Sequence, residues 1–242
     1  MTKVRGCSSL YEPNMAFLKQ FHGSDWFEVE KVVGLKTTSI DVLFEKEGIH
    51  KCDFIKIDVQ GAELDVLKGG MRCLKEHVLG IEVEVEFQSV YRNQPLFSDI
   101  DHYIRDQFGF EIQDLKKYYW KYPEGINYGS AKGKLIFGEA LYFRPPDSIF
   151  HICKRQSLQN AKDTILMAIL MGMVFGYFDY ALSILRRSLD EKYFESHQLI
   201  SLESAIKSYG KGIRYSGQFA SYLSEGFRLL YSLFQPTLGG WG

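Results

Sequence analysis

The sequence lacks the residue patterns of several large classes of protein. Its 242 residues carry a formal net charge of −1, so no excess of positive charge points to a nucleic-acid partner. Its four cysteines include no Cys-x-x-Cys pair and its six histidines are scattered, so neither residue type has the spacing of a metal site. We therefore assign no metal ligands, and we expect reduced, partly buried thiols.

Long apolar runs are also missing. The first residues, MTKVRGCSSLYEPN, include basic side chains but no apolar run after them, which is not the pattern of a secretory signal. The segment from Thr164 to Phe178 carries no charge, but it is shorter than the about 20 residues that a membrane helix needs. We expect a cytoplasmic protein in which this segment is a buried helix or an interface between copies, rather than a membrane contact.

What is present is enough apolar material for a folded core. Hydrophobic residues make up 45% and aromatic residues 15% of the chain, as in a globular protein. Residues 1–147 alternate strand-like and helix-like segments, whereas residues 148–242 show only helical periodicity. The dipeptide Pro145-Pro146 marks the seam because proline ends a strand. We therefore predict an α/β domain followed by an all-α region.

Within residues 1–147, apolar alternation and turn residues predict strands and helices in turn. The strands are expected at residues 27–35, 54–59, 81–87, 110–115 and 135–143. A helix capped by Thr38 or Ser39 and a helix interrupted at Gly69-Gly70 should flank the second strand, and Ser98 should cap a third helix that ends at Gly109. This order predicts a mostly parallel sheet with an antiparallel edge. In the tail, apolar stripes predict helices near 158–178, 180–189, 198–209 and 215–234.

Two carboxylates stand at the ends of predicted strands. Asp58 follows FIKI and Glu86 ends IEVEVE, and ligands of open α/β sheets bind beyond the carboxyl ends of the strands. If these strands are neighbours, both acids face one crevice, where a carboxylate can take a proton from a hydroxyl or hold a metal. The turn after Asp58 adds Gln60, Gly61 and Glu63 as candidate binding residues, since glycine lets the backbone approach a ligand.

Simpler interpretations of the same residues stay open. Asp58 can act only as the cap of the helix that follows it. The stripe of Glu82, Glu84 and Glu86 can be the solvated face of an exposed strand, and three glutamates on one face would repel one another if buried together. We keep Glu84 as a candidate cofactor- or substrate-binding residue beside these alternatives.

Four blocks resemble FkbM-family methyltransferases in the order of that family. They are GCSSLYEPN, DFIKIDVQGAELDVLKGG, IEVEVEFQSVYRNQPLFSDID and KLIFGEALYFR, within residues 6–144. The resemblance implies a class I methyltransferase fold, which is Rossmann-like, with S-adenosylmethionine as donor. It also implies a small-molecule or glycan acceptor, such as the hydroxyl of a sugar or secondary metabolite. It places Asp58, Gln60 and Glu63 beside the site, with Asp58 and then Glu86 as the catalytic candidates.

One departure from the family bears on the function. Members open with a strand, a Gly-rich loop that passes the donor and a second strand ending in an acidic residue, and none of these stands before Gly6. The strand after Asp53 would then lie at an apolar sheet edge. We expect a partial, truncated sheet, completed by an N-terminal half from elsewhere or by another copy of the chain. The alternative function is a non-catalytic module that binds or oligomerises through its helical tail.

Overall fold

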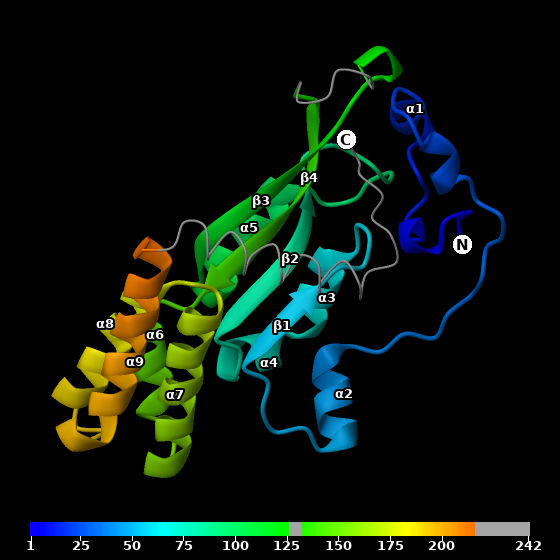
Figure 1. Ribbon diagram of the computed structural model, residues 1–242. Coiled ribbons are helices and arrows are strands. Elements are labelled where there is room, and N and C mark those ends of the chain that lie inside the picture. Colours follow the sequence, from blue (N-terminus) through cyan, green and yellow to red (C-terminus); the bar gives the residue numbers. More distant parts are fainter. Residues whose placement is uncertain (126–131, 216–242) are drawn as a thin grey trace. The chain divides into compact units, whose positions relative to one another are not determined.

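The computed structural model describes residues 1–125 and 132–215, which fall into two compact units divided between Pro145 and Pro146 (Figure 1). The first unit is mixed α/β and the second is helical, which confirms the predicted fold class. Each unit is described separately below.

A four-stranded sheet organises the first unit. Its strands are β1 (Phe54–Ile57), β2 (Gly80–Glu86), β3 (Glu111–Trp120) and β4 (Lys134–Phe143). They lie in the order β1-β2-β4-β3, and only β1 and β2 are parallel. The expectation of a mostly parallel sheet was therefore wrong. The reason is that the β3–β4 hairpin inserts its second strand beside β2 and makes both of its pairings antiparallel.

Helices cover one face of this sheet. Along β2, the odd positions from Ile81 to Val85 are fully buried, because successive side chains of a strand point to opposite faces. They pack against α3 (Glu63–Gly69), α4 (Met71–Glu76) and α5 (Phe97–Phe108). The core of the unit includes Ile57, Leu67, Leu74, Ile81, Val83, Val85, Ile100, Ile104, Ala140 and Tyr142.

The break predicted at Gly69-Gly70 is confirmed and has a steric cause. Ser39 caps α2 (Ile40–Glu47) by accepting a hydrogen bond from the Val42 amide, as predicted. A Cβ atom on Gly70 would lie 3.1 Å from Cδ1 of Ile40 in that helix. Helix α3 therefore ends, and α4 begins, at the glycine pair that packs against the start of α2.

The start of α5 differs from the prediction. The helix begins at Phe97, and the carboxylate of Asp99 accepts a hydrogen bond of 2.9 Å from the Leu96 amide. Ser98 is therefore inside the helix instead of capping it. The end at Gly109, which has a φ of 67°, is confirmed.

The strand predicted at residues 27–35 is absent from the structure. Ser24–Phe27 forms a short 3-10 helix, η2, and Val29 makes only an isolated bridge with Thr2. Val32 is 91% exposed and Leu35 70%. The β-branched pattern gives an extended chain here, but a strand also needs a partner strand, and among the described residues none lies beside residues 32–35.

Arg144 joins several elements at the far end of the sheet. Its guanidinium is 3% exposed and donates hydrogen bonds to the carbonyl oxygens of Val78, Phe108, Leu74 and Lys75. It also lies over the Phe110 ring, 4.5 Å from its centre. One side chain thus satisfies carbonyl groups at the ends of α4 and α5.

The second unit consists of α6 (Pro146–Cys153), α7 (Leu158–Val174), α8 (Phe178–Asp190) and α9 (Ser196–Tyr215). Three of these helices match predicted apolar stripes, whereas α6 was not predicted. The stripe predicted near 215–234 lies, from residue 216 on, outside the described residues. A Cβ on Gly172 would lie 3.0 Å from Cδ1 of Tyr180, so this glycine lets α7 approach α8. The uncharged segment is thus a packed helix of this unit. In the part of the chain that the structure describes, no helix is both long and apolar enough to cross a membrane.

Candidate active site

The carboxyl ends of β1 and β2 lie next to each other, as the sequence predicts. Ile57 pairs with Val83 in the parallel register, so Asp58 and Glu84 follow at the same edge. The side-chain amide of Gln60 joins them: its Nε2 donates to Oδ1 of Asp58 at 2.9 Å and to Oε1 of Glu84 at 2.8 Å. Asp58 is exposed, so its carboxylate is open to a ligand.

A left-handed backbone conformation and two further hydrogen bonds hold Gln60 in place. Its backbone has a φ of 56°, a left-handed conformation that is uncommon for a residue with a side chain. The hydroxyl of Ser9 donates to the Gln60 carbonyl oxygen at 2.5 Å, and the Tyr91 hydroxyl donates to Oε1 at 3.0 Å. Because Oε1 accepts from Tyr91, the Nε2 end is the one that meets the two carboxylates.

Glu63 closes the turn from behind. Its side chain is fully buried, and Oε1 accepts hydrogen bonds from the amides of Val59 at 3.0 Å and Gly61 at 3.1 Å. The helix cap that was the alternative role of Asp58 is therefore not seen, since Ala62 precedes α3 and no carboxylate of Asp58 reaches its amides. The amides of Val59 and Gly61 are thus satisfied within the turn by Glu63.

Gly61 serves the packing of the turn. It has a φ of 98°, and an added Cβ would lie 3.2 Å from Cδ2 of Tyr91. The space left by the missing side chain is filled by Tyr91 and Gln94. The prediction that Gly61 lets a ligand approach the backbone is therefore replaced by a role in admitting these two side chains.

Glu86 is inside the molecule, so Asp58 and Glu86 do not face one open crevice as predicted. The side chain is 2% exposed, and its Oε2, like Oε2 of Glu63, has no hydrogen-bond partner among the described residues. Burial, with the neighbouring charge of Glu63, raises the pKa of Glu86 to about 8, although the Gln94 amide opposes this rise. Glu86 therefore holds a proton at neutral pH.

The neighbouring acids respond to the same burial. Burial raises the pKa of Glu63, against the effect of the amides that it accepts from. Burial also raises the pKa of Glu84 well above its usual range, and the charge of Asp58 adds to this. Burial thus favours the protonated forms of the carboxyl groups that lie behind the exposed Asp58.

The glutamate stripe of β2 is only partly a solvated face. Glu82 forms an ion pair with Lys56 at 2.7 Å, and Glu84 lies opposite Glu139 of β4. Lys116 forms an ion pair with Glu139 at 3.0 Å. Lysine side chains thus pair with Glu82 and Glu139, whereas no lysine or arginine among the described residues forms an ion pair with Glu84 or Glu86, which lie near the turn.

Three functional residues were missed by the sequence patterns. Ser9, Tyr91 and Gln94 hold the turn in place, and the one hydroxyl proton of Tyr91 is shared between Oε1 of Gln60 and the Cys7 carbonyl oxygen, which lies 2.9 Å from the hydroxyl oxygen. All three residues fall within blocks that resemble the family, which is the signal that could have identified them. Across residues 1–125 and 132–215, no cluster of three or more His, Cys, Asp or Glu residues could hold a metal ion.

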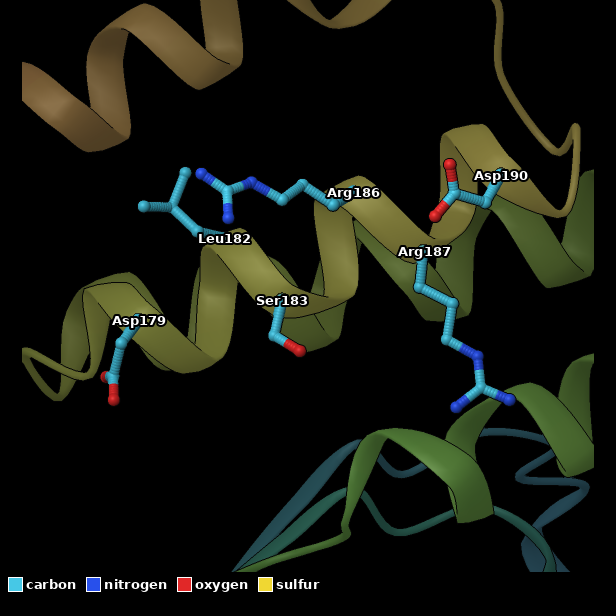
Figure 2. Close-up of a pocket in the computed structure, with 6 residues that line it drawn as sticks. All are labelled: Asp179, Leu182, Ser183, Arg186, Arg187 and Asp190. Carbon is cyan, nitrogen blue, oxygen red and sulfur yellow. The ribbon is translucent and has the colours of Figure 1, made fainter.

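The second unit offers one surface pocket, on α8 (Figure 2). Its lining is Asp179, Leu182, Ser183, Arg186, Arg187 and Asp190. Figure 2 shows the two arginines leaving the helix in different directions, and Arg187 is paired with Asp147 and Glu191. Because one helix supplies the whole lining and this arginine is already neutralised, the turn after β1 is the better candidate site.

The parallel β1–β2 pair, the acidic turn at its carboxyl end and the helices on one face make the first unit an α/β domain with a candidate site at the strand ends. Residues 10–112 match the family model of the methyltransferase FkbM domain, which confirms the resemblance over that segment. The match contains β1, β2 and the candidate residues from Asp58 to Glu86, begins just after Ser9 and ends at the start of β3. No curated protein matches the chain, and no solved structure matches it.

Proposed function

We propose that this chain is an S-adenosylmethionine-dependent methyltransferase that acts in the cytoplasm on a hydroxyl group of a small molecule or glycan, such as a sugar or a secondary metabolite. The family match supports methyl transfer in general. The observation that carries the assignment to a site is the exposed carboxylate of Asp58, held by Gln60 beside Glu84 at the carboxyl end of β1.

The accessible groups suit the donor that the family implies. Asp58 presents an exposed carboxylate, and such a group attracts a cationic sulfonium and accepts hydrogen bonds from ribose hydroxyls. When bound, the donor supplies an electrophilic methyl group. Glu63 and Glu86, in contrast, are buried, so they act on the ligand only through the turn.

Asp58 takes the proton of the acceptor hydroxyl in this account. A carboxylate within hydrogen-bond reach of a hydroxyl can accept its proton as the oxygen attacks. Gln60 keeps one carboxylate oxygen of Asp58 engaged, which orients the other toward the ligand.

The test compares Asp58→Asn with Asp106→Asn, an exposed aspartate on α5. The assay follows transfer of a labelled methyl group to a panel of sugars and secondary metabolites, with thermal unfolding measured in parallel. We expect Asp58→Asn to lower turnover by roughly 100-fold or more while both variants unfold within a few degrees of the parent chain. Equal loss of activity and stability in Asp58→Asn would reduce Asp58 to a structural residue.

A second candidate function is binding through the helical unit, with another copy of the chain or a complementing chain as partner. The observation that favours it is a row of exposed apolar side chains on α7, formed by Leu166, Leu170 and Val174 at steps of four residues. Sedimentation of the parent chain and of Leu170→Glu tests it. A monomer in both cases would count against self-association through this row.

A further inference from the structure

The chain that leads into α2 has the side chains of a strand but no described strand beside it. Residues 28–38 are all exposed and belong to no helix or turn, and Figure 1 shows this part of the chain as a long run without coils. Val32 is 91% exposed, Leu35 70% and Val33 45%. Because β-branched and apolar side chains favour strands, the segment is an apolar surface of the kind that a strand partner covers.

The backbone groups of the segment are open as well. The amide of Lys31 donates to the Met1 carbonyl oxygen at 3.3 Å, and Val29 forms a bridge with Thr2, so the N-terminal residues hold the start of the segment. Beyond Lys31, no described residue forms a backbone hydrogen bond with residues 32–38. Open peptide groups on an extended chain are a template for another strand.

The charges of the segment make it complementary to a second copy of itself. Glu30 and Lys36 stand at equal distances before and after Val33. When two copies run antiparallel with Val33 facing Val33, Glu30 of each copy faces Lys36 of the other. Directly opposite charges stabilise a strand pair, and this pair occurs twice. The same register sets Val32 opposite Gly34, where a built Cβ would meet no atom within 4 Å.

We propose that residues 30–36 of two copies of this chain pair as antiparallel strands, with a two-fold axis at Val33. Each copy uses the same surface, as a two-fold interface requires. The two strands exchange backbone hydrogen bonds and cover the exposed apolar side chains of both copies. The pairing does not depend on methyl transfer, so it is tested separately from the proposed activity.

The interface is small. It takes only residues 30–36 from each copy, against the roughly 20 to 30 residues per side of a stable interface. We therefore expect a weak dimer, with a dissociation constant of about 100 μM, whose population depends on the protein concentration.

Sedimentation of the full chain over a range of concentrations tests the pairing. We expect Glu30→Lys and Lys36→Glu each to weaken the dimer by roughly tenfold, because like charges then meet at both facing positions. An equimolar mixture of the two variants should associate as the parent chain does, since each copy then meets the opposite charge. Glu28→Lys is the matched control and should behave as the parent chain, because residue 28 faces Thr38 in this register.

A disulfide trap tests the register. Facing Cα atoms of antiparallel strands lie about 4.5 to 5.5 Å apart, within reach of a disulfide, so Val33→Cys should cross-link two copies under mild oxidation. Trypsin should then release the peptide VCGLK joined to a second VCGLK. In Leu35→Cys the two new thiols would lie roughly 14 Å apart along the ribbon, so this variant should stay unlinked, like the parent chain.

Three results would overturn the proposal. The first is a parent chain that stays a monomer at every concentration. The second is a dimer that resists both charge reversals and is lost in Leu170→Glu, which would place the contact on α7. The third is equal cross-linking of Val33→Cys and Leu35→Cys, because random encounters between copies would then explain the bond.

Discussion

Replacing Glu86 with glutamine should make the chain less sensitive to high pH. Glutamine has nearly the same shape as a protonated glutamic acid but cannot ionise. The pKa of Glu86 is about 8 in the folded chain against an ordinary value of 4.5, because the side chain is buried beside Glu63. Its contribution to stability is therefore fully present below pH 4.5 and is lost as the pH rises to about 8.

The size of the effect follows from the pKa difference. One pKa unit corresponds to about 1.4 kcal/mol, so ionising Glu86 inside the folded chain costs roughly 5 kcal/mol. Relaxation of the turn and entry of water will reduce this value. We therefore expect Glu86→Gln to gain on the order of 3 kcal/mol over the parent chain between pH 5 and pH 9.

The assay is urea unfolding at pH 5, 7 and 9, followed by tryptophan fluorescence, since Trp26 and Trp120 lie in the unit that holds Glu86. Glu76→Gln, on the exposed face of α4, is the matched control and should follow the parent chain at every pH. If Glu86→Gln and the parent chain lose the same stability between pH 5 and pH 9, then Glu86 is not a buried proton carrier and the described burial of the turn is wrong.

Two further predictions concern the frame of the site. Gly61→Ala should lower stability by about 2 kcal/mol or more, because residue 61 has a left-handed backbone and the new Cβ would meet Tyr91. Gly109→Ala is the control and should cost less, since Gly109 has a φ of 67° but open space around it. Thermal unfolding compares the two variants, and an equal loss of stability would show that packing against Tyr91 is unimportant. Arg144→Lys should lower stability by about 3 kcal/mol, since a lysine cannot replace the guanidinium bonds to buried carbonyl oxygens; urea unfolding measures this, and a loss below 1 kcal/mol would contradict it.

Local features of the fold could be predicted from the sequence. The alternation in IEVEVE predicted β2, and the glycine pair predicted the break between α3 and α4, because both patterns depend on only a few neighbouring residues. The position of β4 in the sheet could not be predicted, since it depends on which strand of the hairpin pairs with β2. Among the described residues, the strand-like segment at residues 27–35 pairs only through the isolated bridge between Val29 and Thr2, and a sequence pattern does not show whether a partner strand exists.

The acids of the site show the same limit. Asp58 and Glu86 were recognised as candidates because they stand at strand ends, and Glu84 because it belongs to the glutamate stripe of β2. Their different burial could not be foreseen, since it is set by Tyr91 and Gln94 folding back over the turn from a loop after β2. Sequence thus locates the acidic edge, and tertiary packing decides which acid faces solvent and which keeps a proton.

The central claim is that this chain binds a methyl donor at the turn after β1. Calorimetric titration of S-adenosylmethionine, and of its demethylated product, into the purified chain tests this most directly. We predict binding with a dissociation constant in the micromolar range, about −8 kcal/mol, that weakens at least tenfold in Asp58→Asn and is unchanged in Asp106→Asn. A folded chain that takes up neither compound would contradict the account and would favour a non-catalytic binding role.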